Sequence, residues 1–257
     1  MATLEAQGLT KCYTAVPAVS DVTFSLRSGE ILGCLGPNGS GKSSTVRMLI
    51  GLSEPTRGRV LFDGKEISAD LVGYRRQLGY VPEEADLYPF LSGWEYLELV
   101  GTLRGISAVR LRKKIDSMLE LFSLHSHRHT PTGSYSKGMR QRILLIAALL
   151  HDPHLLIFDE PLSGLDVTSA LIVKNLIRGL GERGKAVFYC SHVLEVVEKV
   201  CSHVMILRNG RVLAYAPTEE LQKSVGLTNL EAAFVHLVED RDAQTVAREI
   251  LQEMDAA

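Results

Sequence analysis

The sequence predicts an α/β protein in which a mostly parallel sheet carries helices on both faces and is interrupted by a helical insert. Two nearly continuous apolar runs, at 30–36 and 154–160, are typical of strands buried on both faces of a sheet. Segments with apolar residues at three- and four-residue spacing lie between such runs and indicate amphipathic helices. Strands that alternate with helices favour parallel pairing, since the helix returns the chain to the edge where it began.

Taken in chain order, the first elements are strands. Residues 4–13 and 19–26 alternate apolar and polar side chains, which indicates a pair of half-buried strands. The buried strand at 30–36 ends in a glycine-rich turn, and residues 43–52 have a helical pattern. Residues 58–67 then predict a strand, a turn at Asp63-Gly64 and a short return strand.

A helical insert is expected from about residue 84 to about residue 145. The segments 92–106 and 107–124 each begin with a serine, which favours helix capping. Four aromatic residues near the start of this insert predict local core packing, with contact to a partner as the alternative: Tyr88, Phe90, Trp94 and Tyr96. Strands return at 154–160, 185–191 and 203–210, with a helix at 167–181 between the first two. A helical tail follows, with one apolar face formed by Leu230, Phe234, Leu237, Val246 and Ile250.

Composition excludes several classes of function. Of 257 residues, 46% are hydrophobic and 23% charged, and 28 Lys and Arg face 30 Asp and Glu for a net charge of −2. No nucleic-acid partner is expected, because such partners require a basic surface. The four cysteines form no CxxC pair, which disfavours metal and redox chemistry. Three histidines in the segment 125–130 suggest a solvated loop, with a metal site as the alternative.

We find no secretory leader and no apolar run long enough to cross a bilayer. If the protein serves a membrane, we expect it to act from outside the lipid.

A phosphate-binding loop is the most specific motif. Gly36, four intervening residues, Gly41, Lys42 and Ser43 form the P-loop pattern between a strand and a helix. The glycines let backbone N–H groups converge on one point, and the helix adds its positive end. The expected cradle comprises Gly36, Pro37, Asn38, Gly39, Ser40, Gly41, Lys42, Ser43 and Ser44.

Two acids end the strand at 154–160. Asp159 is predicted to hold Mg²⁺ together with the Ser43 hydroxyl. Glu160 follows directly and is the candidate base for an attacking water. Taken alone, the two acids could simply end a strand in solvent, but the P-loop favours a shared site.

The polar stretch 133–142 precedes a long apolar run. Ser136 is predicted to cap the helix that follows, and its hydroxyl, the Gly138 backbone and the helix N-terminus then form an anion site. Lys137 could add attraction for the anion, whereas solvated positions are expected for Arg140 and Arg142.

Together these motifs resemble the ATP-binding subunit of an ABC transporter, and the resemblance covers the chain to about residue 216. It rests further on YSKGM at 135–139 as the signature, PLSGLD at 161–166 as the D-loop, and YCSH ending at His192 as the switch histidine. Tyr13 occupies the position of an aromatic under the adenine, and Glu83 lies in the Q-loop. The resemblance implies ATP and Mg²⁺ as cofactors, with Glu160 and His192 catalytic.

The implied architecture is a P-loop NTPase, RecA-like core with an N-terminal antiparallel β subdomain and an inserted helical subdomain, followed by a helical tail at 217–257. In such proteins Ser136 and Gly138 serve the nucleotide of a second subunit, so a homo- or heterodimer is expected, and Asp166 of the D-loop is expected among the nucleotide-binding residues. A separate membrane permease is the other implied partner. It would hold the chain at the cytoplasmic face of the cell membrane.

Two departures from the family pattern matter. The commonest signature is Leu-Ser-Gly-Gly-Gln, whereas Lys137 and Met139 replace its first glycine and its glutamine. Similar signatures occur in exporter-type (ABC-2) members, which favours export. Glu83 stands where a glutamine is usual, and we expect it to approach the metal. The alternatives are a soluble ABC-type ATPase that acts on DNA or ribosomes, and a small-molecule P-loop kinase.

Overall fold

The computed structural model describes residues 3–224 and four single positions of the tail, namely 230, 234, 252 and 254. Its first sheet is antiparallel, has the strand order β2-β1-β4-β5, and is formed by the N-terminal part of the chain. The strands are β1 (Thr3–Cys12), β2 (Pro17–Arg27), β4 (Arg57–Phe62) and β5 (Lys65–Glu66). These ranges agree with the strands expected at 4–13, 19–26 and 58–67.

The second sheet has six strands in the order β10-β9-β3-β8-β7-β6, and all neighbours pair in parallel except β10 and β9. The three strands β3, β7 and β8 are buried along their whole length, as their apolar runs predict. The strands are β3 (Ile31–Leu35), β6 (Leu78–Val81), β7 (Leu155–Asp159), β8 (Ala186–Cys190), β9 (His203–Arg208) and β10 (Arg211–Pro217).

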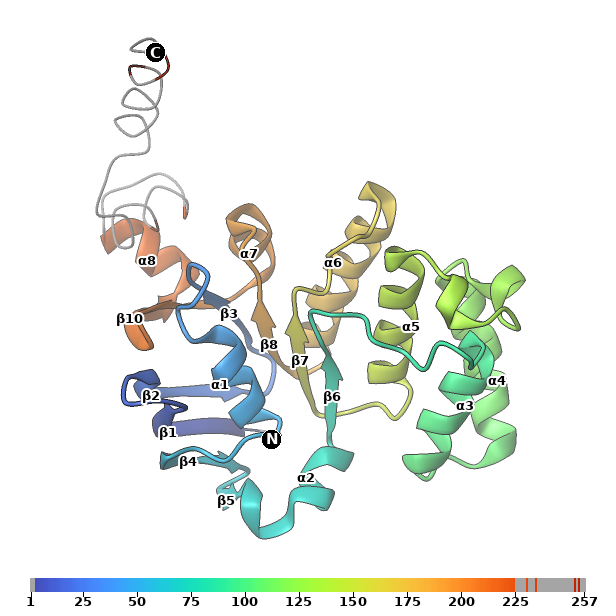
Figure 1. Ribbon diagram of the computed structural model, residues 1–257, viewed down its shortest axis with the longest axis horizontal. Helices are drawn as coiled ribbons and strands as arrows, with labels where there is room; N and C mark the ends of the chain where they lie inside the picture. The colour runs from blue at the N-terminus through green and yellow to red at the C-terminus, as the bar shows by residue number, and fades with distance from the viewer. Residues whose placement is uncertain (1–2, 225–229, 231–233, 235–251, 253, 255–257) are drawn as a thin grey trace.

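Helices cover both faces of this sheet (Figure 1). On one face, α1 (Lys42–Leu49) packs in a core shared with the antiparallel sheet. On the other face lie α6 (Val167–Glu182) and α7 (Leu194–Val200), and Leu230 is buried in the same core. Two short helices, α2 (Leu71–Arg76) and α8 (Thr218–Ser224), complete these layers.

A separate helical layer extends to one side of the sheet, beside β6 and β7 (Figure 1). It contains α3 (Gly93–Leu103), α4 (Ala108–Leu121) and α5 (Lys137–Leu149), which share a third apolar core. The Ser92 hydroxyl accepts a hydrogen bond from the backbone N–H of Glu95, whose carboxylate accepts one from the N–H of Ser92; this reciprocal pair starts α3.

Several expectations about this region are corrected. Ser107 precedes α4, but its side chain makes no capping bond. The first helix, by contrast, begins at Gly93 with Ser92 as its cap, as expected for the segment 92–106. Tyr88 and Phe90 are 63% and 92% exposed, so they are not core residues, whereas Trp94 and Tyr96 pack beside the helical core.

Four helices and strands were not anticipated from the sequence: α2, β6, α7 and β10. The division at residue 216 stays a proposal. In the expected tail helix, Leu237, Val246 and Ile250 lie outside the described residues. Within the described part of the chain, no helix combines the length and apolar character needed to cross a bilayer.

Candidate functional site

A cleft of about 280 Å³ opens at the carboxyl ends of β3, β7 and β8, where α1 begins. This is the edge at which parallel sheets bind ligands. The cleft collects most of the residues expected around a nucleotide, together with Ala18: Tyr13, Asn38, Gly39, Ser40, Gly41, Lys42, Ser43, Ser44, Glu83, Asp159, Glu160 and His192.

The loop between β3 and α1 depends on glycines. Gly41 precedes α1 with φ 104°, and a Cβ there would lie 2.7 Å from the carbonyl oxygen of Ala18. A Cβ on Gly36 would lie 2.4 Å from the carbonyl oxygen of Leu207, so the loop can approach that strand only without a side chain. Because no side chain caps α1, its first N–H groups stay available to an anion.

Two polar side chains of the loop fit a phosphate ligand. The Ser40 hydroxyl is buried and has no hydrogen-bond partner among the residues that the structure describes. The Lys42 ammonium donates to the carbonyl oxygens of Gly36 at 2.6 Å and Pro37 at 3.1 Å, so it is folded over its own loop. From this position it can exchange backbone oxygens for phosphate oxygens.

Acidic groups crowd the opposite side of the cleft. Asp159 ends β7 and is only 6% exposed. Burial above all, together with the neighbouring charges of Glu83 and Glu160, raises the pKa of its carboxyl to about 6, although the charge of Lys42 acts in the opposite direction. A buried carboxylate among other acids is stabilised by a cation.

The donor set suits Mg²⁺, which is commonly held by one or two protein oxygens together with substrate phosphates. Ser43 and Asp159 line the cleft together, as expected. Among the described residues, no three His, Cys, Asp or Glu side chains form a metal-binding group by themselves. The fit therefore depends on the phosphates as well as on the protein.

Glu160 is held by two residues that follow β8. One carboxylate oxygen lies 2.8 Å from Nδ1 of His192, and the other accepts a hydrogen bond from the Ser191 hydroxyl at 3.3 Å. Glu160 itself has φ 48°, a strained backbone conformation for a residue with a side chain. The candidate base and the switch histidine are thus in contact in the same chain, and Ser191 is a partner that the sequence did not reveal.

Tyr13 lies at the rim of the cleft with 55% of its surface exposed. A hydrogen bond with Ser44, at the start of α1, lowers the pKa of its hydroxyl. The Lys11 ammonium lies 5.3 Å from the ring centre. The ring is therefore positioned beside the phosphate loop and accessible for stacking.

The other predicted group lies outside this cleft. Ser136 caps α5, as expected, and accepts a hydrogen bond from the Met139 N–H at 3.2 Å. A Cβ on Gly138 would lie 2.6 Å from the carbonyl oxygen of Gly164, so the signature is packed against the D-loop. Asp166 caps α6 by accepting from the Ser169 N–H at 2.9 Å.

Two arginines beside the signature, which were expected to be solvated, instead donate hydrogen bonds to backbone carbonyl oxygens. Arg140 donates to the carbonyl oxygen of Tyr135 at 2.5 Å, and Arg142 donates to that of Phe122 at 2.9 Å. Both are partly buried, so they stabilise their own subdomain. Between them Gln141, whose burial the sequence pattern does not predict, is completely buried and donates to the carbonyl oxygen of Pro161 at 3.2 Å.

Comparisons with known proteins agree with this geometry. The ABC transporter family matches residues 19–163, which is more than half of the chain. The chain is 35% identical to the ABC-type transporter ATP-binding protein EcsA of Bacillus subtilis (strain 168), over 88% of this chain and 92% of that protein. It is 34% identical to the Nod factor export ATP-binding protein I of Ralstonia nicotianae, over 85% of this chain and 68% of that protein.

Solved structures give the same result. A structure of the ATP-binding subunit of an ABC transporter superimposes with a TM-score of 0.86 at 33% identity, covering 91% of this chain and 98% of that one. A dimeric ATP-binding cassette in a post-hydrolysis state, bound to ADP and phosphate, superimposes with a TM-score of 0.78 at 25% identity, covering 84% and 98%. With its P-loop cleft, its capped signature helix and these relatives, the chain belongs to the ABC transporter family.

Proposed function

We propose that this chain is an ATP-hydrolysing motor subunit that dimerises around ATP and drives a separate membrane permease. One observation carries the proposal. The cleft of the chain contains the P-loop, Asp159, Glu160 and His192, but its lining does not include Ser136 or Gly138. A capped helix N-terminus that is not used in its own cleft is suited to cover the phosphates bound in a second copy.

The chain's own residues define the chemistry. Lys42 and the N–H groups at the start of α1 bind the phosphates, and the Tyr13 ring orients the base. Ser43 and Asp159 would hold Mg²⁺, which offsets phosphate charge when bound. The Glu160 carboxylate, once turned from His192 toward the cleft, accepts a proton from the attacking water. His192, 75% exposed, is then free to donate to the γ-phosphate.

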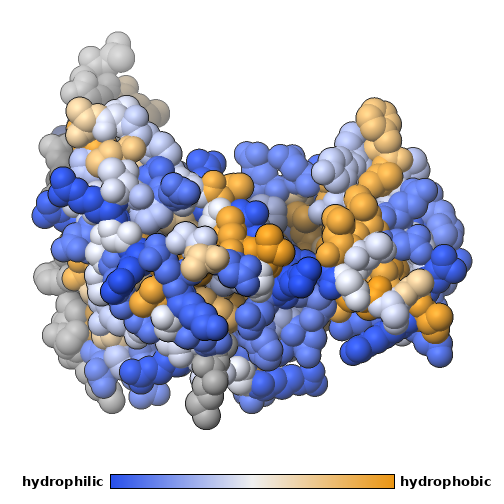
Figure 2. All heavy atoms as spheres, turned by 90° about the horizontal axis from the view of Figure 1, so that it is seen from below, coloured by the Kyte–Doolittle hydropathy of each residue, from blue (hydrophilic) through white to orange (hydrophobic). Residues whose placement is uncertain are grey.

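A groove of about 500 Å³ between the end of α1, α2 and the end of α3 is the proposed contact with the permease. Its exposed apolar side chains are Leu52 at 67%, Val72 at 66% and Leu103 at 76%, and arginines stand among them. Figure 2, seen from the side of α2, shows apolar residues gathered between hydrophilic ones on this face. A short permease helix with an apolar face and acidic ends would complement the groove.

Contact through this groove would hold the chain at the cytoplasmic face of the cell membrane. Export is the proposed direction, supported by the SKGM signature and by similarity to a relative whose name denotes export. The groove is tested by Leu103→Asp, which should release the chain from its permease without reducing ATP hydrolysis. Val109→Asp, at a 73% exposed apolar position outside the groove lining, is the matched control.

The shared site is tested by mixing two inactive variants. Lys42→Ala disables the site on its own P-loop, whereas Ser136→Arg disables the site on the partner's P-loop. In a mixed dimer both lesions fall in one site, and the other site is intact. Random mixing makes about half of the dimers hybrid, so about a quarter of all sites should be whole if the dimer has two-fold symmetry.

Phosphate release should therefore return on mixing, while pull-down of differently tagged chains reports hybrid formation. If hybrids form but neither phosphate release nor trapping of labelled ATP returns, Ser136 acts within its own chain and the shared site is wrong.

A further inference from the structure

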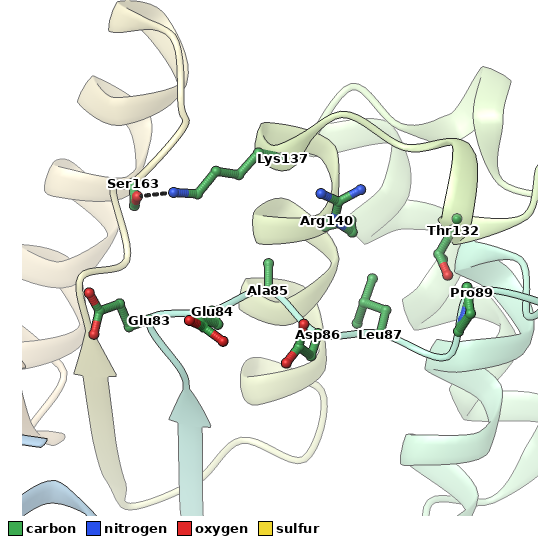
Figure 3. Close-up of a pocket in the computed structure, with 11 residues that line it drawn as sticks. Glu83, Glu84, Ala85, Asp86, Leu87, Pro89, Thr132, Lys137, Arg140 and Ser163 are labelled. Atoms are coloured by element: carbon green, nitrogen blue, oxygen red, sulfur yellow. Dashed lines mark hydrogen bonds between the residues drawn. The ribbon is translucent and has the colours of Figure 1, made fainter. Parts of the chain in front are cut away.

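The signature is joined to the D-loop by a side chain that the commonest family signature does not have. The Lys137 ammonium donates a hydrogen bond to the Ser163 hydroxyl at 2.7 Å, and Figure 3 shows this bond crossing from the first turn of α5 to the segment after β7. Below the bond lies a cavity of about 510 Å³, whose far wall is the acidic stretch 83–86. Lys137 extends toward Ser163 rather than into that acidic wall (Figure 3).

Backbone packing strengthens the same junction. The stem of Lys137 lies so close to Gly164 that a Cβ there would be 2.8 Å from the lysine Cγ. Gly138 meets the carbonyl oxygen of Gly164 in the same way. One turn further along α5, the buried amide of Gln141 donates to the carbonyl oxygen of Pro161. The first turns of α5 and residues 161–164 therefore have little freedom to move independently.

This junction begins directly after Glu160. The positive φ of Glu160 ends β7 and starts the turn that leads to Ser163, whose N–H donates to the carbonyl oxygen of Glu160 at 3.1 Å. Only Pro161 and Leu162 separate Ser163 from Glu160, so a displacement of Ser163 is transmitted to the backbone that carries the candidate base. Lys137 touches the far end of this turn and does not line the nucleotide cleft.

We propose that Lys137 is a positioning residue: through Ser163 it fixes the D-loop of its own chain and so orients Glu160 for hydrolysis. The proposal rests on the function proposed above, in which the signature contacts the partner's nucleotide. When α5 closes onto the partner's nucleotide, its displacement reaches Ser163 through Lys137. It is thereby transmitted to Glu160, the candidate base of the chain's own site. Lys137 acts on the hydrolytic step, not on the affinity for ATP.

The test uses variants that keep the packing. Lys137→Met keeps the stem over Gly164 and removes only the ammonium, while Ser163→Ala removes only the hydroxyl acceptor. Each should lower kcat about five-fold and leave KM within two-fold, the size expected for losing one exposed charged hydrogen bond. The double variant should be no slower than either single one, because both remove the same contact. Ser163→Thr keeps a hydroxyl and should retain parental turnover.

Two controls complete the test. Lys113→Met removes an exposed lysine on α4 and should leave kcat unchanged. In a Glu160→Gln background, Lys137→Met should have no further effect, since the residue to be oriented has lost its function. Thermal unfolding verifies that every variant is folded.

Three results would overturn the proposal. Lys137→Met could raise KM while Ser163→Ala is silent, which would mean that the ammonium binds the partner's phosphates directly. The two losses could multiply in the double variant, which would mean that they are independent. Lys137→Met could also leave kcat unchanged. Because the mixed-dimer experiment retains Lys137 in both chains, it tests the shared site separately.

Discussion

Two helix N-termini of the molecule are both suited to bind phosphate, and they are built differently. α1 follows Gly41, which offers no capping side chain, and beside it the Ser40 hydroxyl is buried with no hydrogen-bond partner in the described part of the chain. α5 follows Ser136, whose hydroxyl already caps the helix, and Lys137 beside it is bound to Ser163. The first site has a buried hydroxyl that is left for a ligand, whereas the Ser136 and Lys137 side chains of the second are engaged within the chain.

This difference indicates a division of labour. An N-terminus with unsatisfied groups, acids for a cation and a candidate base has the elements of a site that binds nucleotide by itself. An N-terminus whose side chains are engaged with the D-loop adds few groups of its own, so it acts by its position. Variants at the first site should therefore change nucleotide binding to a single chain, whereas variants at the second should leave that binding unchanged and alter the turnover of the dimer.

The largest expected effect lies in the first site. Glu160→Gln should retain ATP binding and lose turnover by about 10²-fold or more, because the water loses its base while the phosphate loop is untouched. Phosphate release and binding of labelled ATP measure the two properties. Near-normal phosphate release would mean that Glu160 is not the base for the attacking water. His192, whose Nδ1 lies 2.8 Å from the Glu160 carboxylate, would then become the candidate base.

A pair of glycine variants separates the two N-termini directly. Gly41→Ala forces a side chain into φ 104° against the Ala18 carbonyl oxygen and should weaken nucleotide binding to the single chain at least ten-fold. Gly138→Ala pushes against Gly164 and should leave that binding unchanged, but lower turnover about ten-fold. Gly179→Ala in α6 meets no atom within 4 Å and is the control. If Gly138→Ala weakened binding to a single chain, the division of labour would be wrong.

The sequence predicted these two sites unequally well. The P-loop, its acids and the Ser136 cap follow from local spacing, which is the information that a short motif carries. The Ser163 partner of Lys137 is 26 residues away and could not be inferred from spacing. Gln141 stands between two arginines, a pattern typical of a solvated helix face, yet tertiary packing places it in the interior. β6, with only four residues including Gly79, is too short to give a periodic signal.

A further effect on nucleotide binding is expected at the rim of the first site. Tyr13→Ala should weaken ATP and GTP together by about 1–3 kcal/mol, if its ring stacks on the base as aromatic residues do in nucleic-acid-binding proteins. The loss should appear in a single chain, measured by titration with a fluorescent nucleotide. Phe90→Ala removes an even more exposed ring, away from the cleft, and should have no effect. Unaltered affinity in Tyr13→Ala would leave its ring as a surface residue packed under Lys11.

The smallest expected effect concerns Glu83, which lines both the nucleotide cleft and the cavity beneath Lys137. If its carboxylate helps to hold Mg²⁺ with Asp159, Glu83→Gln should raise the Mg²⁺ concentration for half-maximal turnover about three-fold, because an amide oxygen is a weaker ligand than a carboxylate. The nucleotide affinity without Mg²⁺ should not fall, since removing a negative charge near the phosphates only reduces repulsion. Glu84→Gln, one residue further from the cleft, is the control for lost charge.

An unchanged Mg²⁺ titration would mean that Glu83 does not bind the metal ion and instead serves as part of the cavity wall that faces Lys137. In that case Glu83 belongs with the second N-terminus, and its variant should alter turnover only in the dimer.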